Sequence, residues 1–197
     1  MYIHGYASTG NAKKAQILQQ MFPECRLVSP TFDYNTLSPD EIQGVIRQLV
    51  EENDVNLMVG SSFGGYHALC ATMFFEGPVW CINPVRDVVA TISMLLNKGV
   101  DERFLAERTA GMQSAIPPHA DTMIATYADF NRRVFDHLPR RNGQLNFFLS
   151  TDDEVLGSHL PLLDLFPNTN RVVWRDNAGH GFTFFSQMHD EIAATLK

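Results

Sequence analysis

The chain has 197 residues, of which 45% are hydrophobic and 19% are charged, and its formal net charge is −7. This composition is typical of a globular protein, and the acidic balance argues against nucleic acid as a partner because the phosphate backbone would repel the chain. No apolar run reaches the roughly 18 residues of a membrane span, and the start of the chain lacks the pattern of a secretory signal.

The three cysteines, Cys25, Cys70 and Cys81, do not have the spacing of a metal site. An odd number of cysteines in a chain without a secretory signal indicates reduced thiols. We therefore expect a cytoplasmic protein.

Short apolar runs alternate with helical patterns along the chain. The predicted elements are, in order, a strand at 1–3, a helix at 13–22, a strand at 25–28, a helix at 39–52, a strand at 55–59, a helix at 63–75, strands at 79–82, 145–149 and 171–174, and a helix at 183–196. The helix at 39–52 has the clearest signal, because Ser38 is a suitable N-cap, Pro39 suits the first turn and Glu41 stands at the third position.

Residues 85–141 interrupt this alternation, with helical patterns at 88–96 and 122–138 and no convincing strand. Alternating strands and helices build a parallel sheet that is covered by helices on both faces. We therefore predict a single α/β domain over residues 1–197, a three-layer α/β/α sandwich. Residues 85–141 are predicted to form a helical insertion, or cap, over the carboxyl edge of the sheet.

Residues 60–64 read GSSFG and fit the pattern G-x-S-x-G, with Ser62 at its centre. The pattern alone is weak, but an apolar run precedes it and a helical pattern follows it, as a nucleophile elbow requires. The sharp turn strains the backbone of the serine, and glycine at positions 60 and 64 avoids collisions with the neighbouring strand and helix. We predict that Ser62 is a nucleophile at the N-terminus of a helix.

A serine nucleophile needs a base, and at such an elbow the chain order is serine, then acid, then histidine. His180 follows the predicted strand at 171–174, and glycines on both sides allow it to project toward Ser62. His189 is a rival, but it falls inside the predicted last helix. The other histidines are predicted to be structural or surface residues: His4, His67, His119, His137 and His159.

The acid should follow the preceding strand, where the sequence offers Asp152, Asp153 and Glu154. Such a carboxylate fixes the tautomer of the histidine and stabilises its protonated form. Asp153 is the first choice and Asp152 the second, because Asp152 could instead cap a helix beginning near Glu154.

The oxyanion of the reaction needs two backbone donors. The first candidate is the N–H of Phe63, directly after the nucleophile. The second is the N–H of Tyr6, in the loop after the first strand, because Gly5 allows the backbone to approach the site closely. The side chain of Tyr6 either lines the entrance or packs against the core.

These motifs resemble those of small bacterial α/β-hydrolases of the YqiA/YcfP type, an esterase-like family similar to the uncharacterised family UPF0227. The matching stretches are YIHGYAST, GSSFGGYHA, CINPVRD, TDDEVL and GHGF. The resemblance implies a reduced α/β-hydrolase fold, hydrolysis of carboxylic esters or acyl thioesters, and roles as nucleophile, acid and base for Ser62, Asp153 and His180. The first strand is unusually short for this family, and residues 85–141 match only loosely.

The predicted function is that of a serine hydrolase that cleaves a small acyl ester or thioester through an acyl-enzyme, without a metal or cofactor. Two alternatives stay open. The first is a non-catalytic protein of the same fold that binds a ligand or a partner. The second is the same triad acting on another acyl bond or on a carbon–carbon bond.

The insertion supplies apolar residues that either pack against the core, which is the preferred interpretation, or line an acyl pocket. They are Met94, Leu95, Leu96, Met112, Met123 and Phe130. Arg86 and Arg103 either hold an anionic group of the substrate or form surface ion pairs, and the ion pairs are the preferred interpretation.

Overall fold

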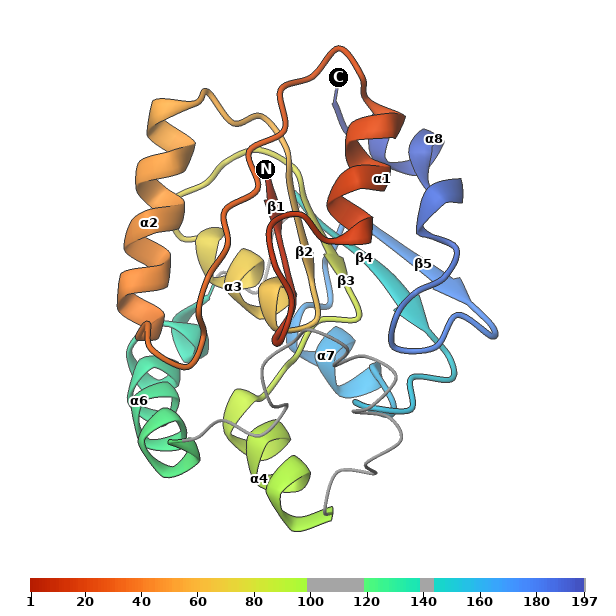
Figure 1. Cartoon of the computed structure of the whole chain (residues 1–197). Coiled ribbons are helices and arrows are strands. Elements are labelled where there is room, and N and C mark those ends of the chain that lie inside the picture. Colours follow the sequence, from red (N-terminus) through yellow and green to blue (C-terminus); the bar gives the residue numbers. More distant parts are fainter. Residues whose placement is uncertain (99–118, 139–143, 197) are drawn as a thin grey trace.

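The computed structural model describes residues 1–98, 119–138 and 144–196. In these ranges five strands form one sheet in the order β1-β2-β3-β4-β5, and every neighbouring pair is parallel (Figure 1). All carboxyl ends therefore lie at one edge of the sheet. The strands are β1 (Tyr2–Ile3), β2 (Met58–Ser61), β3 (Val79–Ile82), β4 (Leu145–Ser150) and β5 (Arg171–Arg175).

Helices cover both faces of the sheet, so the predicted α/β class with a parallel sheet is confirmed. Each face has its own cluster of buried apolar side chains. One cluster is covered by α1 (Lys13–Met21), η2 (Phe185–Gln187) and α8 (His189–Ala193), and the other by α2 (Pro39–Glu52), α3 (Phe63–Ala71), α6 (Ala120–Arg133) and α7 (Leu160–Leu165) (Figure 1).

The helix α2 begins and packs as its sequence predicts. The Ser38 hydroxyl accepts a hydrogen bond from the Glu41 amide at 3.2 Å, and the Glu41 carboxylate accepts one from the Ser38 amide at 2.8 Å. This reciprocal cap satisfies two backbone donors that the first turn leaves free. Ile42 and Ile46, one turn apart, are fully buried against the sheet.

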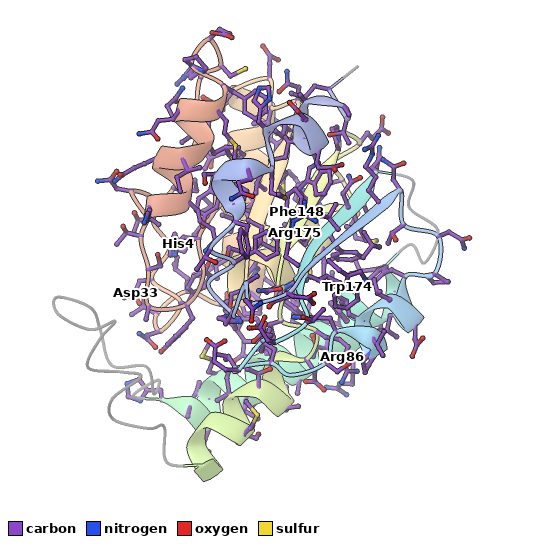
Figure 2. The ribbon with its side chains drawn as sticks, turned by 90° about the vertical axis from the view of Figure 1, so that its right-hand side faces the viewer. His4, Asp33, Arg86, Phe148, Trp174 and Arg175 are labelled. Carbon is purple, nitrogen blue, oxygen red and sulfur yellow. The ribbon has the colours of Figure 1, made fainter. Side chains whose placement is uncertain are left out.

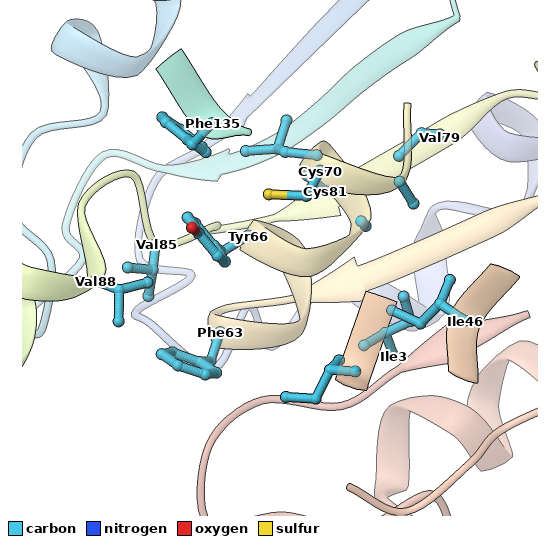
Figure 3. Packing of buried hydrophobic residues seen from close by; sticks show 14 of the residues in the cluster. Ile3, Ile46, Phe63, Tyr66, Cys70, Val79, Cys81, Val85, Val88 and Phe135 are labelled. Atoms are coloured by element: carbon cyan, nitrogen blue, oxygen red, sulfur yellow. The ribbon is translucent and has the colours of Figure 1, made fainter. Parts of the chain in front are cut away.

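The helix α3 is the central helix of its face, since all nine of its residues are buried. A helix that is apolar on every side must be surrounded by protein. Phe63, Tyr66 and Cys70 pack among side chains from several elements, including Val85 and Phe135 (Figure 3). The rigid setting of α3 matters for the site, because this helix begins directly after Ser62.

Two helices from residues 85–141 lie near the carboxyl edge of the sheet (Figure 1). They are α4 (Val88–Lys98) and α6, which is followed by the short helix η1 (Phe135–His137). Tyr127 and Phe130 of α6 are buried in the cluster around α3. At the helix end, Arg133 forms an ion pair with Asp40 of α2, 2.6 Å between nitrogen and oxygen, which is exposed and adds little stability.

The predicted strand at 25–28 is wrong, because the segment forms no strand. It runs beside β1, and the Tyr2 amide donates to the Val28 carbonyl at 2.9 Å. Since β1 has only two residues, it offers too short a partner for a regular ladder of hydrogen bonds.

The predicted helix at 183–196 is also wrong as one continuous element, because η2 and α8 replace it. Hydrogen bonds of the i→i+3 kind run from the Phe185 amide to the Phe182 carbonyl and from the Met188 amide to the Phe185 carbonyl. Three residues per turn place side chains three apart on the same side. Phe182, Phe185 and Met188 are accordingly buried together.

Smaller differences concern the ends of elements. The helix predicted at 63–75 ends at Ala71, where the Thr72 hydroxyl bonds back to the Leu69 carbonyl at 2.7 Å and turns follow. The strand predicted at 55–59 is shifted to Met58–Ser61, where it pairs with both β1 and β3. The helix predicted at 122–138 ends at Arg133 and continues as η1.

Gly60→Ala is expected to lower the free energy of unfolding by about 2 kcal/mol or more. A Cβ at this position would lie 2.4 Å from the Gly64 carbonyl oxygen and 2.7 Å from the Ala68 Cβ, both on the buried helix α3. Gly44→Ala is the matched control, because nothing lies within 4 Å of its Cβ position on α2. It should raise stability by about 0.5–1 kcal/mol. Urea unfolding of both variants measures these changes, and equal free energies of unfolding for Gly60→Ala and Gly44→Ala would contradict the prediction.

Candidate active site

Ser62 occupies the turn between β2 and α3. Its backbone angles are φ 55° and ψ −117°, a conformation that residues other than glycine rarely adopt. Three hydrogen bonds hold this turn: the Ser62 amide donates to the Ile82 carbonyl at 2.9 Å, and the Ser62 carbonyl accepts from the Val85 and Tyr66 amides, both at 3.1 Å. The strained residue is therefore fixed from both β3 and α3.

Close backbone packing surrounds this turn. A Cβ on Gly64 would lie 2.3 Å from the carbonyl oxygens of Ile3 and His4, so that only glycine fits where α3 meets the end of β1. A Cβ on Gly5 would lie 3.3 Å from the Ser62 Cβ and 3.8 Å from its Oγ. The loop after β1 thus lies directly against the Ser62 side chain.

His180 reaches Ser62 from the loop after β5. Its Nε2 lies 2.9 Å from the Ser62 Oγ, across 118 positions of sequence. The backbone of His180 is held at both its amide and its carbonyl. The His180 amide donates to the Glu154 carboxylate at 2.8 Å, and the His180 carbonyl accepts from the Asn83 side chain at 3.0 Å.

Asp153 lies on the far side of the His180 ring, in the turn after β4. Its Oδ2 and Oδ1 are 2.9 and 3.0 Å from the His180 Nδ1, and its side chain has no exposed surface. Burial alone would raise the pKa of this carboxyl, but hydrogen bonds from His159 and His180 outweigh it and lower the pKa. The resulting carboxylate can only accept, so the His180 Nδ1 donates to it and Nε2 is left to accept the proton of Ser62.

Asp152, the second candidate for the acid, points elsewhere. Its Oδ1 accepts from the Ser150 hydroxyl at 2.5 Å and from the Ala178 and Gly179 amides at 3.1 and 3.2 Å. The predicted helix near Glu154 is absent, and the interpretation of Asp152 as its cap is wrong. The next helix, α7, begins only at Leu160, and Asp153 itself accepts from the Val155 and Leu156 amides of the turn that follows it.

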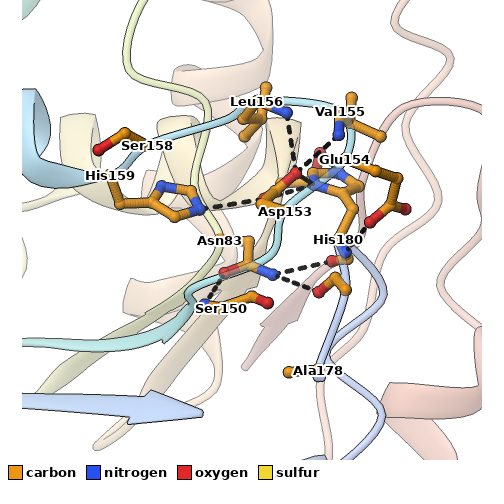
Figure 4. A network of polar contacts seen from close by, with 12 residues as sticks. Asn83, Ser150, Asp153, Glu154, Val155, Leu156, Ser158, His159, Ala178 and His180 are labelled. Carbon is orange, nitrogen blue, oxygen red and sulfur yellow. Dashed lines mark hydrogen bonds and ion pairs between the residues drawn. The ribbon is translucent and has the colours of Figure 1, made fainter. Parts of the chain in front are cut away.

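Three further residues lie around the site: Asn83, Glu154 and His159 (Figure 4). Glu154 was one of the three acids that the sequence offered, and His159 was predicted to be a structural or surface residue. Asn83 has φ 41° and joins two loops, because its Oδ1 accepts from the Ser150 amide and its Nδ2 donates to the Gly179 and His180 carbonyls. His159 is buried, and its Nε2 lies 3.0 Å from the Asp153 Oδ2. The sequence signals for Asn83 are its position directly after a strand and its place in the stretch CINPVRD.

The Tyr6 amide lies in the loop after β1, and the Phe63 amide lies at the first residue of α3, directly after Ser62. Neither donates a backbone hydrogen bond to another residue in the described ranges. The Phe63 ring is held by the rings of Tyr6, Tyr34, His67 and Tyr127, with centroids 4.8 to 5.9 Å away. The Tyr6 side chain packs here and donates to Asn35, and burial raises its pKa to about 12.

A cavity of about 260 Å³ lies beside the site, between the segment after β3, α4, the turn after β4, and α7. Arg86 lies at the carboxyl end of the sheet (Figure 2) and lines the cavity together with Met94, Leu156 and His159. The ion pairs between described residues do not include Arg86, and its predicted surface ion pair stays a prediction. Arg103 lies outside the described residues.

The apolar residues of the insertion divide into groups. Met123 and Phe130 are buried in the core cluster, as the packing interpretation predicts, whereas Met94 lines the cavity. Met112 lies outside the described ranges, and so do the side chains of Leu95 and Leu96.

Within the described ranges no group of three or more His, Cys, Asp or Glu residues is placed to hold a metal ion.

Cys70 and Cys81 are buried and Cys25 is exposed, and burial raises the pKa of both buried thiols. No helix in the described part of the chain is long and apolar enough to cross a membrane.

Solved structures with a similar fold are α/β-hydrolase-type proteins. The monoacylglycerol lipase of Paleococcus ferrophilus has a TM-score of 0.70 and 12% identity, over 99% of this chain and 92% of the lipase. The mouse alpha/beta hydrolase domain-containing protein 10 has a TM-score of 0.62 and 14% identity, over 100% and 89% of the two chains. Est1E of Butyrivibrio proteoclasticus has a TM-score of 0.62 and 11% identity, over 98% and 84%.

At these identities the likeness shows the fold, which is the α/β-hydrolase fold. No curated protein sequence matches the chain. The family model described as an uncharacterised protein family, UPF0227, matches residues 1–197. The chain therefore belongs to the family UPF0227.

Proposed function

We propose that this protein is a serine hydrolase that cleaves carboxylic esters or acyl thioesters. The observation that carries the proposal is the continuous chain of contacts from the Ser62 Oγ through His180 to the buried Asp153, with distances of 2.9 Å at both ends of the imidazole. A nucleophile, a base within hydrogen-bond reach and a group that orients the base are the requirements of covalent catalysis.

In the first half of the reaction, the Nε2 of His180 takes the proton of Ser62, and the Oγ attacks the carbonyl carbon of the substrate. The carbonyl oxygen becomes an oxyanion and is stabilised by the amides of Phe63 and Tyr6. The N-terminus of α3, which begins at Phe63, adds favourable electrostatic potential for this charge. The bond to the leaving alcohol or thiol then breaks, and His180 gives its proton to the leaving group.

In the second half, His180 takes a proton from a water molecule, and the resulting hydroxide attacks the acyl-enzyme. A second oxyanion forms at the same amides, and its collapse releases the carboxylic acid and returns the proton to the Ser62 oxygen. Asp153 stays ionised throughout and stabilises the protonated His180. The cycle uses only residues of this chain, the substrate and water.

The choice of an acyl ester or thioester rests on the chemistry of the triad. It also rests on the names of solved proteins with a similar fold, which include a monoacylglycerol lipase. We further propose that residues 85–141 form the cap over the site and select the acyl chain. The placement of α4 and α6 near the carboxyl edge of the sheet supports this assignment (Figure 1).

A fluorophosphonate probe tests the activated serine, because it reacts only with a nucleophilic hydroxyl in an assembled site. The expected result is one adduct on the wild type by intact mass, none on Ser62→Ala, and wild-type labelling of Ser61→Ala. Ser61 is the matched control, since it is the neighbouring residue but ends β2 with its side chain buried. A panel of esters and acyl-CoA thioesters of increasing chain length would then define the substrate.

Two outcomes would contradict the proposal. One is a well-folded wild type that forms no adduct. The other is an adduct that persists in Ser62→Ala, which would place the reactive group elsewhere.

A further inference from the structure

Asp153 accepts hydrogen bonds from two imidazoles rather than one. His180 approaches from the loop after β5, and His159 approaches from the start of α7, where its Nε2 lies 3.0 Å from the Asp153 Oδ2 (Figure 4). Both residues are buried, with 6% of His180 and 4% of His159 exposed. A serine hydrolase triad needs only the first of these two contacts, so the second calls for its own explanation.

The two oxygens of Asp153 are held differently. Oδ1 accepts from the Val155 and Leu156 amides at 3.0 and 2.8 Å. Among the described residues, Oδ2 has His159 as its only donor besides His180. His159 therefore contacts the side of the carboxylate that the backbone of the turn does not reach.

The backbone also fixes His159 itself. Its carbonyl accepts from the Leu162 amide at 3.0 Å and from the Leu163 amide at 3.3 Å, which anchors it at the first turn of α7. Its ring nitrogen bonds the acid and not the serine, so it is not placed to act as a second base. One edge of the residue lines the cavity that Arg86 and Leu162 also line.

We propose that His159 is a positioning residue of the hydrolase: it holds the Asp153 carboxylate in the plane that His180 requires, and shares its negative charge. This inference rests on the proposed function, whose residues it serves. The His159 ring donates a hydrogen bond to the same carboxylate as His180. This hydrogen bond reduces the stabilisation that Asp153 gives to the protonated form of His180. Loss of the donor should therefore raise the pKa of His180 and impair its alignment.

The titratable groups around this pair limit the other causes of such a shift. Asp153 contacts both rings, and Glu154 accepts from the His180 amide. Arg86 and Asp87 share the cavity with His159, whereas the cavity-lining residues of α4 and α7 are uncharged: Ala90, Thr91, Met94 and Leu162. None of these charges is altered by a substitution at position 159.

The test compares His159→Leu, His159→Asn and His159→Gln with the wild type. The glutamine amide can extend as far as the imidazole Nε2, whereas the asparagine amide is too short to reach Asp153. We expect kcat for ester hydrolysis to fall about ten-fold or more in the leucine and asparagine variants, with little change in KM. We expect the glutamine variant to stay within about three-fold of the wild type.

The decisive readout is the pKa of His180, measured by ¹⁵N NMR of labelled histidines and by the acidic limb of kcat/KM. It should rise by about half a pH unit or more in His159→Leu and His159→Asn, and return toward the wild-type value in His159→Gln. Leu162→Ala is the structural control, because it removes a buried side chain from the same cavity but no donor to Asp153. It should lower stability and leave the pKa of His180 unchanged.

The proposal is overturned if the pKa of His180 in every His159 variant equals that of the wild type. It is also overturned if Leu162→Ala shifts this pKa as much as His159→Leu does. Should His159→Leu fail to fold, the comparison of glutamine with asparagine decides the matter, since equal behaviour of the two would contradict positioning by a donor. The NMR measurement does not depend on turnover. An inactive wild type would therefore refute the proposed function without affecting the test of the contact between His159 and Asp153.

Discussion

Asp153→Asn should lower kcat for ester hydrolysis by about 10⁴-fold. The substituted amide would present an N–H₂ group as well as a carbonyl to the His180 Nδ1. The turn amides of Val155 and Leu156 donate to the Oδ1 position and would keep the new carbonyl oxygen there. The N–H₂ group would then face both imidazoles, so His180 would turn its lone pair to it and carry its proton on Nε2. In that tautomer, Nε2 cannot accept the proton of Ser62.

Asp152→Asn is the control for this change, since it alters the adjacent residue in the same way. The Asp152 Oδ1 accepts from two amides of the histidine loop, and an asparagine keeps an oxygen that can accept these bonds. We expect a decrease in kcat of less than about ten-fold. Steady-state kinetics of the two variants decide between the two candidate acids, and a larger loss in Asp152→Asn than in Asp153→Asn would assign the acid to Asp152.

The sequence contains enough information to bring Ser62, Asp153 and His180 together, because the relevant constraints are local. Glycines beside Ser62 and His180 mark turns, and the three residues all follow predicted strands. In a parallel sheet, residues that directly follow strands meet at one edge. That these groups meet at one edge can therefore be predicted without knowledge of side-chain packing, whereas the choice between Asp152 and Asp153 could not.

The roles of His159 and Asn83 could not be predicted in this way. The position of His159 depends on the turn that Asp153 itself closes, where the Gly157 amide donates to the Asp153 carbonyl at 2.9 Å. The sequence pattern instead predicted a helix near Glu154, which the structure does not contain. Asn83 bonds across loops that are 67 and 97 residues away in the chain. Such contacts depend on three-dimensional packing and leave no periodic signal.

The missing strand at 25–28 has a similar cause. Its apolar residues resemble those of true strands, and its backbone does lie against β1 at Tyr2. Whether an apolar run becomes a strand depends on the length of its neighbour, which the run itself does not encode. The α/β class was predicted correctly because it depends on the alternation of the longer elements.

Ser62→Gly is expected to abolish turnover, with kcat reduced by about 10⁶-fold, and yet to be more stable than Ser62→Ala. Both variants lack the hydroxyl and lose the contact with His180. Only glycine adopts φ 55° and ψ −117° without steric cost, a cost of about 1–3 kcal/mol for other residues. The greater freedom of glycine in the unfolded chain offsets about 0.5–1 kcal/mol of this gain.

The comparison with Ser62→Ala isolates the backbone, since the two side chains differ by one methyl group that has no hydrogen bond. Urea unfolding should give the glycine variant an advantage of about 1–2 kcal/mol in the free energy of unfolding. Equal stabilities would mean that the elbow carries no strain. The expected advantage would mean that the hydrogen bonds to Ile82, Val85 and Tyr66 hold Ser62 in a conformation that the serine alone would not adopt. The strained turn directs the hydroxyl at His180, and the rest of the fold supplies the stability that this placement costs.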